Sequence, residues 1–225
     1  MMLRIAARRV AALLVAVLMC GGRGAYGAEP APADFKAGQT AYAAGDYARA
    51  ARVWQPLAEH GDAQAQYGMG MLARRGLAGP RDAAAAAQWW RKAANQGHMA
   101  SQFNLGVLYE AGEGVRQSYD EAFKWYRLAA ERGDPDAQFN LGLLYAAGRG
   151  TRRDLTAAAD WYRKAADQGD AAAQYTLGLS YAAGMGVKED RKAAVTWLQK
   201  AAAQGFQPAR DALAKLAPDT KERQP

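Results

Sequence analysis

The stretch "AQFNLGLLYAAGRGTRRDLTAAADWYRKAADQGD", residues 137 to 170, decides the fold because its pattern recurs along the chain. Four glutamines, each followed by an aromatic residue, are separated by a constant step of 36 residues. Residues that recur in every unit are expected to hold the unit together, because one active site needs each of its residues only once. The recurring positions include Gln66, Gln102, Gln138 and Gln174, then Gly70, Gly106, Gly142 and Gly178, and then Trp89, Trp125, Trp161 and Trp197.

The quoted stretch predicts two short helices joined at a glycine corner. Asp134 and Pro135 are typical of a helix start, because aspartate accepts hydrogen bonds from first-turn amides and proline tolerates the first helical position. Gly148 and Gly150 follow the first helix, and glycine can end a helix and reverse the chain at positive φ. Asp154 then begins the second helix. Equivalent starts in other units are Asp62, Asp82, Asp170, Asp190 and Ser118, the last in a capping-box pattern with Glu121.

Glycine inside the first helix is expected to serve packing. Gly142 removes a side chain where Trp161 or a neighbouring helix must approach, and this close approach outweighs a helix penalty of about 1 kcal/mol. Ala158, Trp161 and Ala165 fall on one face of the second helix. The repeated glycines and tryptophans are therefore the predicted structural core.

The chain of 225 residues is rich in alanine and glycine and has no segment of alternating strand character, which predicts an all-α fold. One helix pair cannot bury both of its faces, so successive pairs are expected to stack into an α-solenoid. The expected parts are a leader at 1–27, a helix pair at 28–62, four units at 63–98, 99–134, 135–170 and 171–206, a capping helix at 207–217 and a flexible tail at 218–225.

The first residues are typical of a secretory signal peptide. Arg4, Arg8 and Arg9 precede an apolar run that is too short to span a membrane, and Ala25-Tyr26-Gly27 fits a cleavage site. Cleavage is expected after Gly27 or Ala28, with Gly22 as an alternative. Two rival interpretations are a twin-arginine signal at Arg8-Arg9 and lipidation of Cys20, whose preceding residue, Met19, is larger than a lipidation site favours. The mature protein is thus expected in the periplasm, without a membrane span.

Charge does not indicate a nucleic-acid partner. The chain carries 29 basic and 22 acidic residues, but four of the arginines lie in the first 28 residues, which contain no acid. The mature chain has a net charge of 25 − 22 = +3, and its charges of both signs are interspersed. It also has no cysteine, so its stability must come from helix packing without disulfides.

The sequence offers no clear catalytic, cofactor or metal site. The glycine corners lack the preceding strand and the Gly-Lys-Ser/Thr sequence of a phosphate loop. His60 and His98 are not at metal-ligand spacing, and His98 stands where other units have the aspartate that begins a helix. The pattern places no histidine to activate Ser101 or Ser180.

A binding function would depend on first-helix residues that do not face the partner helices. Asn104 and Asn140 lie just before the Leu-Gly pair, and Met69 and Thr176 are assigned to the same role in the outer units. An amide both donates and accepts hydrogen bonds, which suits an extended peptide. The alternative is that these amides bond within their own repeat.

The quoted stretch resembles the Sel-one-like repeat (SLR), a branch of the tetratricopeptide (TPR) superfamily, over about residues 65 to 206. The resemblance implies a right-handed α-solenoid with a TPR-like N-terminal helix pair. It also implies a non-enzymatic adaptor or regulator, here a monomer that binds a protein or peptide in the bacterial envelope. Some cysteine-rich exported relatives are linked to β-lactamase or penicillin-binding activity, so an envelope hydrolase is the alternative function, although this chain lacks their cysteines.

Overall fold

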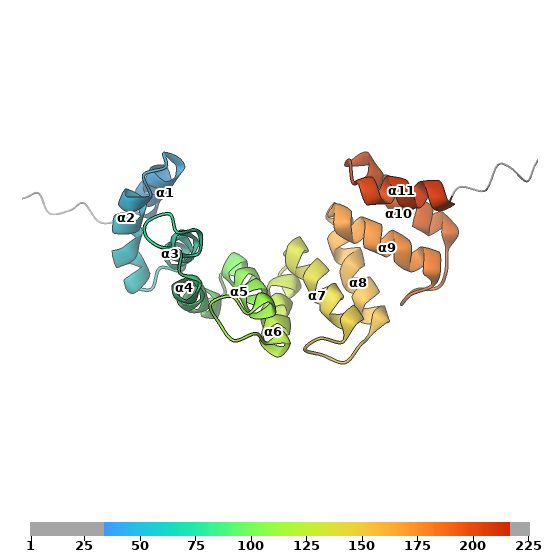
Figure 1. Ribbon diagram of the computed structural model, residues 1–225, viewed down its shortest axis with the longest axis horizontal. Coiled ribbons are helices and arrows are strands. Elements are labelled where there is room, and N and C mark those ends of the chain that lie inside the picture. Colours follow the sequence, from blue (N-terminus) through green and yellow to red (C-terminus); the bar gives the residue numbers. More distant parts are fainter. Residues whose placement is uncertain (1–33, 217–225) are drawn as a thin grey trace, which may run out of the picture. The chain divides into compact units, whose positions relative to one another are not determined.

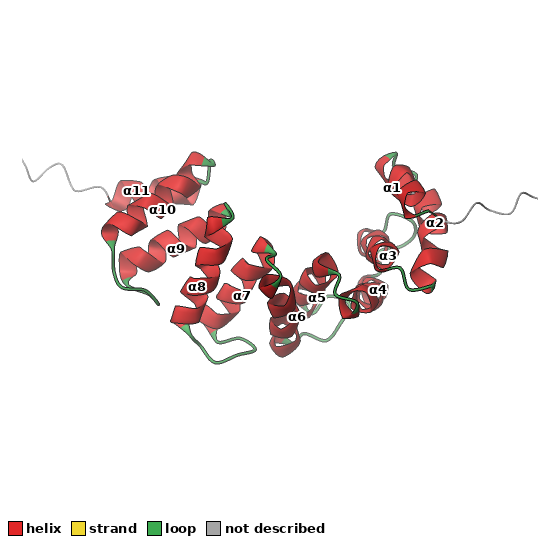
Figure 2. Cartoon of the chain, turned by 180° about the vertical axis from the view of Figure 1, so that it is seen from behind, coloured by secondary structure: helices red, strands yellow, loops and turns green. Residues whose placement is uncertain are grey.

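The computed structural model describes residues 34–216, which form eleven α-helices and no strands over that range (Figures 1 and 2). The predicted signal peptide, Cys20 and the tail lie outside the described residues. The helices are α1 (Phe35–Ala43), α2 (Tyr47–Glu59), α3 (Ala63–Arg75), α4 (Ala83–Asn95), α5 (Met99–Ala111), α6 (Tyr119–Glu131), α7 (Pro135–Ala147), α8 (Leu155–Asp167), α9 (Ala171–Ala183), α10 (Arg191–Ala203) and α11 (Gln207–Leu216).

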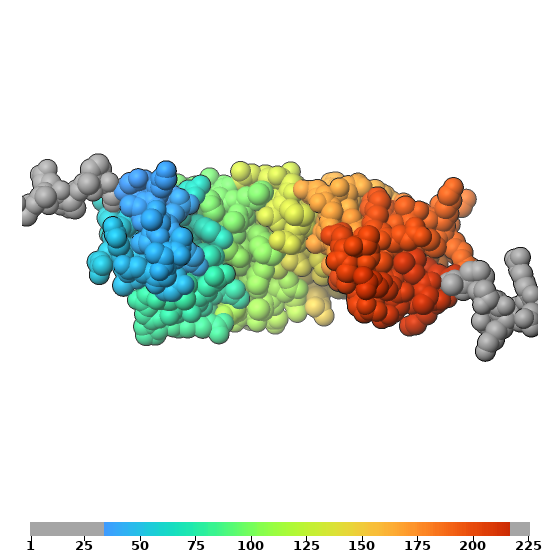
Figure 3. Space-filling view, turned by 90° about the horizontal axis from the view of Figure 1, so that it is seen from above, coloured from blue at the N-terminus to red at the C-terminus, as the bar shows by residue number. Residues whose placement is uncertain are grey.

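Each helix makes its substantial contacts with the helices immediately before and after it in the chain. The pairs α3–α4, α5–α6, α7–α8 and α9–α10 pack most extensively, and the second helix of each pair then packs on the helix that follows it. In the space-filling view, the colours accordingly follow one another in sequence order (Figure 3). The predicted all-α solenoid of stacked helix pairs is confirmed.

The helices start where the sequence predicts, at side chains that accept hydrogen bonds from first-turn amides. Asp134 Oδ1, for example, accepts from the Ala137 amide at 2.8 Å. Ser118 Oγ accepts from the Glu121 amide at 3.3 Å, whereas the Glu121 carboxylate binds Lys124 Nζ at 2.7 Å. The serine half of the expected capping box is therefore formed, and the glutamate carboxylate is engaged by the lysine instead.

The two glycines of each corner have different structural roles. Gly148 ends α7 in the left-handed conformation, with φ of 67°. Gly150 also has a φ of 67°, but it lies so close to the Tyr119 carbonyl at the start of α6 that a Cβ there would collide with it. Gly114 and Gly186 approach the preceding unit in the same way. The second glycine thus permits contact between units, and the first full unit has Ala78 at this position.

The side chain that packs against the glycine inside each first helix is not the repeated tryptophan. A Cβ on Gly142 would lie 2.6 Å from Tyr162 Cε1, and Tyr162 is 4% exposed, whereas Trp161 is half-buried. Of the two expected neighbours of Gly142, Trp161 or a neighbouring helix, the structure has the neighbouring helix α8, which contacts Gly142 through Tyr162, one residue after Trp161. The same offset holds at Trp90, Tyr126 and Leu198, which lie against Gly70, Gly106 and Gly178.

The repeated glutamines tie each unit to its neighbour. Gln138 Nε2 donates to the Ala130 carbonyl at 3.1 Å, and Gln138 Oε1 accepts from Gln168 Nε2 at 2.8 Å. Gln168 Nε2 also donates to the Gly133 carbonyl at 3.0 Å. Equivalent bonds join Gln66 to Gln96 and Gln174 to Gln204. We call this arrangement the glutamine link.

The glutamine link is incomplete in the second unit. Arg132 occupies the position of Gln168 there, and its guanidinium donates to the Gly97 carbonyl. Gln102 Oε1 is buried and has no hydrogen-bond partner among the described residues. The cost of such an unpaired buried acceptor is typically about 1–3 kcal/mol, so this junction is expected to be weaker than the others.

Candidate peptide-binding surface

Two rows of residues run across one side of the first helices α3, α5, α7 and α9. Positions three or four apart lie on the same face of a helix, so the two rows are neighbours. The first, which we call the amide row after its two central asparagines, is Gly68, Asn104, Asn140 and Thr176, and the second is an aliphatic row of Met71, Val107, Leu143 and Leu179. We call the two rows together the first-helix surface. Neither row contains a charged residue, although 23% of the residues in the chain are charged.

The two central asparagines are half-buried. Within residues 34–216, no hydrogen bond involves the side chain of Asn104 or Asn140. Thr176 differs, because its hydroxyl donates to the Ala172 carbonyl one turn earlier in α9, at 2.8 Å. The two asparagine amides therefore keep their donors and acceptors for water or for a ligand.

Met69 does not belong with the asparagines. The step of 36 residues places Gly68 at the position of Asn104, and it places Met69 at the position of the buried Leu105. Met69 packs instead on the core formed by α1, α2 and α3, next to Trp89. The assignment of Met69 to the amide row is therefore wrong by one residue. The chemical reason is that Gly68 has no side chain from which its place in the row could be recognised.

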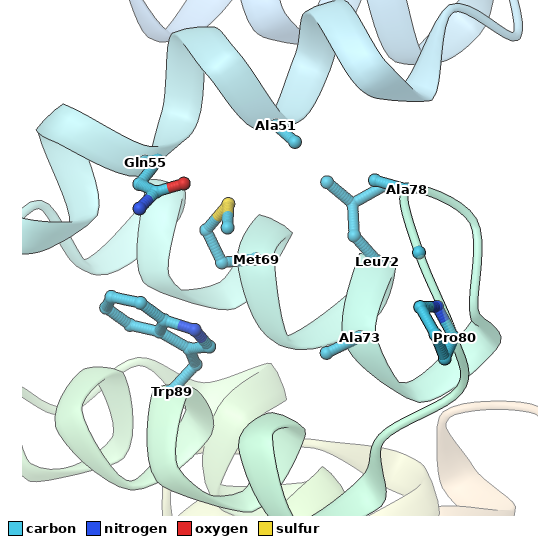
Figure 4. A pocket seen from close by; sticks show the side chains of 9 residues that line it. Ala51, Gln55, Met69, Leu72, Ala73, Ala78, Pro80 and Trp89 are labelled. Atoms are coloured by element: carbon cyan, nitrogen blue, oxygen red, sulfur yellow. The ribbon is translucent and has the colours of Figure 1, made fainter.

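Met69 lines a different hollow, which is bounded by α2, α3, α4 and the loop between α3 and α4 (Figure 4). Its volume is 230 Å³, and Figure 4 shows Met69 between Gln55 and Trp89, with Pro80 on the opposite wall. The loop that forms this wall contains Ala78, where the other units have the corner glycine that contacts the preceding unit. The unit that has Ala78 instead of a corner glycine therefore also has this hollow, which lies on the side of the second helices.

A second hollow opens on the first-helix surface, between α1 and α3. Its volume is 260 Å³. We call it the α1–α3 pocket, and its lining includes Phe35, Tyr42, Trp54, Tyr67, Gly68 and Met71. Gly68 and Met71 belong to the amide and aliphatic rows, so the pocket is continuous with the first-helix surface. The sequence pattern did not indicate this site, because its lining combines residues of α1, α2 and α3.

The repeated tryptophans form a row on the second helices. Lys92, Lys164 and Lys200 place their ammonium groups over the rings of Trp89, Trp161 and Trp197, at 4.3, 3.6 and 3.9 Å from the ring centroids. The fourth tryptophan, Trp125, has an indole N–H that is buried without a hydrogen-bond partner among the described residues. Each ring packs partly on the core of the preceding unit, which is a structural role.

His98 and Ser101 make the contact that comes nearest to catalytic chemistry. His98 Nδ1 lies 3.0 Å from Ser101 Oγ and accepts a hydrogen bond from the Ser101 amide at 3.3 Å. A histidine therefore lies beside Ser101, although the sequence pattern placed none there to activate it. However, Ser101 is 0% exposed, so no substrate can reach its hydroxyl, and the histidine replaces the aspartate that begins the equivalent helices. Ser180 is also buried, and its hydroxyl donates to the Thr176 carbonyl.

Two titratable groups beside these features have shifted pKa values. Burial, followed by the positive charge of Arg132, lowers the pKa of His98, and Asp62 opposes this shift. Burial, followed by the nearby carboxylates of Asp134 and Asp170, raises the pKa of Asp136 near the start of α7. Within the described residues, no group of three or more histidine, cysteine or acidic side chains is arranged to hold a metal ion.

Comparison with known proteins identifies the repeats. The model of the Sel1 repeat matches residues 63–98, 100–134, 135–170 and 171–206, which is more than half of the chain. No curated protein sequence matches significantly. Among the helices of the described part, none is long and apolar enough to cross a membrane.

Two solved structures are similar to this chain at substantial identity. A Sel1 repeat protein from Oxalobacter formigenes is 37% identical, with a TM-score of 0.77, over 81% of this chain and 75% of that chain. A protective antigen present in uropathogenic Escherichia coli strains, which displays an SLR fold, is 31% identical, with a TM-score of 0.74. The match covers 81% of this chain but 44% of the antigen. Four matched repeats and these two structures lead to one conclusion: the chain belongs to the Sel1 repeat family.

Proposed function

We propose that this protein is a non-enzymatic scaffold of the bacterial envelope that binds an extended segment of a protein partner on its first-helix surface. The Sel1 repeat fold typically mediates protein–protein interaction, which supports a protein partner. The observation that carries the proposal is the pair of side-chain amides, Asn104 and Asn140, which lie one repeat apart and make no hydrogen bond within residues 34–216.

The aliphatic row supplies the other half of the recognition. Leu143 is 40% exposed, and Met71, Val107 and Leu179 are half-buried beside the amide row. An exposed apolar stripe next to polar groups is typical of a protein-binding surface. An extended segment would place its backbone against the two amides and alternate side chains against the aliphatic row. The protein acts as a monomer in this proposal, in an adaptor or regulatory role.

The envelope location rests on the leader pattern of residues 1–27. N-terminal sequencing of the protein recovered from periplasmic extract should give a chain that starts at Ala28 or Glu29, as cleavage after Gly27 or Ala28 requires. A chain that starts at Met1, or one that carries a lipid on Cys20, would contradict this location.

Binding is tested by capture of partners from envelope extract on the immobilised protein. The double variant Asn104→Ala/Asn140→Ala should weaken capture while its thermal midpoint stays near that of the wild type. The matched control is Asn95→Ala, since Asn95 is the remaining asparagine of the chain and lies exposed at the end of α4. Normal capture by the double variant would place the recognition surface elsewhere, and equal losses in the control would show that the effect is not specific.

A further inference from the structure

The α1–α3 pocket lies where α1 and α3 both rest on the indole ring of Trp54. A Cβ on Gly38 would lie 2.1 Å from Trp54 Nε1, and one on Gly68 would lie 2.7 Å from Trp54 Cε3. The two glycines therefore let the backbones of α1 and α3 approach the ring, whereas the later units have Asn104, Asn140 and Thr176 at the position of Gly68. A recess of 260 Å³ lies beside Trp54, at the N-terminal end of the first-helix surface.

The indole N–H in this recess is already paired. Trp54 Nε1 donates to the Phe35 carbonyl at 3.1 Å, and the Phe35 ring stacks on Trp54 with centroids 5.6 Å apart. Tyr42, Tyr67 and Met71 complete the walls, and no charged side chain lines the recess. A charged guest would lose its hydration without finding a countercharge in the lining, so the recess favours an uncharged, apolar group.

The size and the rim of the recess limit the guest further. Sites for small molecules usually have about 300–1,000 Å³, and this volume is below that range, so it suits one side chain of a larger partner. Gln39 and Gln64 line the rim and are exposed. Their amides can both donate to and accept from a peptide backbone on either side of the inserted side chain.

Charge distinguishes the two ends of the recess. Arg75 is exposed and donates to the Tyr42 hydroxyl at 3.1 Å, which places a cation at the Tyr42 end. Asp34 and Asp62 lie at the other end of the two helices, where α1 and α3 begin. Their carboxylates accept hydrogen bonds from the Lys36 amide at 3.0 Å and the Ala65 amide at 2.7 Å. The acids are thus engaged in starting α1 and α3, whereas the arginine faces solvent beside the recess.

We infer that the α1–α3 pocket gives the binding surface its sequence specificity: it accepts one apolar side chain of an extended peptide segment that carries an acidic residue beside it. The apolar group packs on Trp54, the flanking backbone bonds to Gln39 and Gln64, and the acidic group pairs with Arg75. This inference rests on the proposed function, and it assigns the pocket as the place where one partner segment is distinguished from another.

The test uses three blocked pentapeptides titrated into the purified protein and followed by NMR chemical shifts. Ser-Glu-Leu-Glu-Ser should bind most tightly. Replacing its leucine with alanine should weaken binding about tenfold or more, because most of the buried apolar area is lost. Replacing both glutamates with lysines should weaken it by a smaller factor of about two to five, as expected for one exposed ion pair.

Three protein variants locate the binding. Met71→Gln places a polar amide in the apolar wall of the pocket and should weaken binding of the leucine peptide about tenfold or more. Arg75→Glu changes an exposed residue and should reverse the preference between the glutamate and lysine peptides. The matched control is Asn95→Ala at the exposed end of α4, outside the pocket and the first-helix surface, which should leave binding of these peptides unchanged. If Met71→Gln unfolds the protein, the charge reversal at the exposed Arg75 still decides the question.

The outcomes separate this inference from the proposed function. Absence of binding at about 1 mM peptide, or equal binding by the wild type, Met71→Gln and Arg75→Glu, would overturn the pocket assignment. A captured partner that is lost in Asn104→Ala/Asn140→Ala but retained in Met71→Gln would keep the proposed function and remove the pocket from it. Self-association of the protein that disappears in Met71→Gln would show that a second copy fills the pocket, which also overturns the inference.

Discussion

Replacement of Arg132 by glutamine should stabilise the protein. The link between Gln138 and Gln168 shows what a glutamine does at this position: one Nε2 donates both to Gln138 Oε1 at 2.8 Å and to the Gly133 carbonyl at 3.0 Å. In the second unit, Arg132 makes the carbonyl bond but leaves Gln102 Oε1 buried without a partner. Arg132→Gln supplies that missing donor.

The size of the gain follows from the bonds that change. The bond to the Gly97 carbonyl is kept, so the change adds one hydrogen bond to an acceptor that is already buried. Satisfying such an acceptor is worth about 1–3 kcal/mol, and we expect the lower end because the glutamine loses side-chain entropy when it is fixed. A gain of about 1 kcal/mol corresponds to a rise of about 2–4 °C in Tm for a domain of this size.

The assay is thermal and urea unfolding followed by far-ultraviolet circular dichroism. The reciprocal variant Gln168→Arg serves as the matched control, because it should leave Gln138 Oε1 unpaired and lower the midpoint by a similar or larger amount. If Arg132→Gln leaves the midpoint unchanged or lowers it, and Gln168→Arg is neutral as well, the glutamine link does not contribute to stability and the reasoning is refuted.

Three further predictions concern the core, the histidine and catalysis. Tyr162→Ala should lower the unfolding free energy by about 3–5 kcal/mol, because Tyr162 fills the space beside Gly142. Trp161→Ala should cost less, and equal urea midpoints for the two variants would contradict this ranking. The lowered pKa of His98 means that the unfolded chain takes up a proton first as the pH falls below about 6.5, so urea stability should decrease between about pH 7 and about pH 5. The part of this decrease that His98 causes should vanish in His98→Asp. An identical pH profile for that variant would show that His98 does not contribute to the pH dependence of stability. The purified protein should not hydrolyse β-lactams or peptidoglycan fragments, and turnover that survives repurification but disappears in one point variant would instead favour an enzyme.

The sequence predicts the repeat architecture well, because each helix boundary is marked by its own chemistry. Asp134 and Gly148 start and end α7 as expected, and the step of 36 residues transfers these assignments to the other units. The prediction was less successful within the helices. Trp161 and Tyr162 are both large and adjacent, and the pattern alone did not show which of them lies against Gly142.

The candidate site was harder to predict for a related reason. Asn104 and Asn140 are recognisable because their amides are present, and they stay predicted ligand contacts. Gly68 was overlooked in favour of Met69, since a glycine has no side chain that marks its place in the row. His98 was recognised as standing at a helix start, but its contact with Ser101 depends on the side-chain geometry in the first turn of α5.

The restriction of substantial contacts to consecutive helices has a consequence for how such a protein changes length. No extensive packing joins α3 to α9, so no long loop must close before the chain can fold, and local contacts favour rapid folding. A whole unit between two glycine corners could therefore be duplicated or deleted, and the remaining junctions would keep their geometry. A single in-frame recombination event can therefore change the number of units. The length of the solenoid changes with that number, while its end units stay the same.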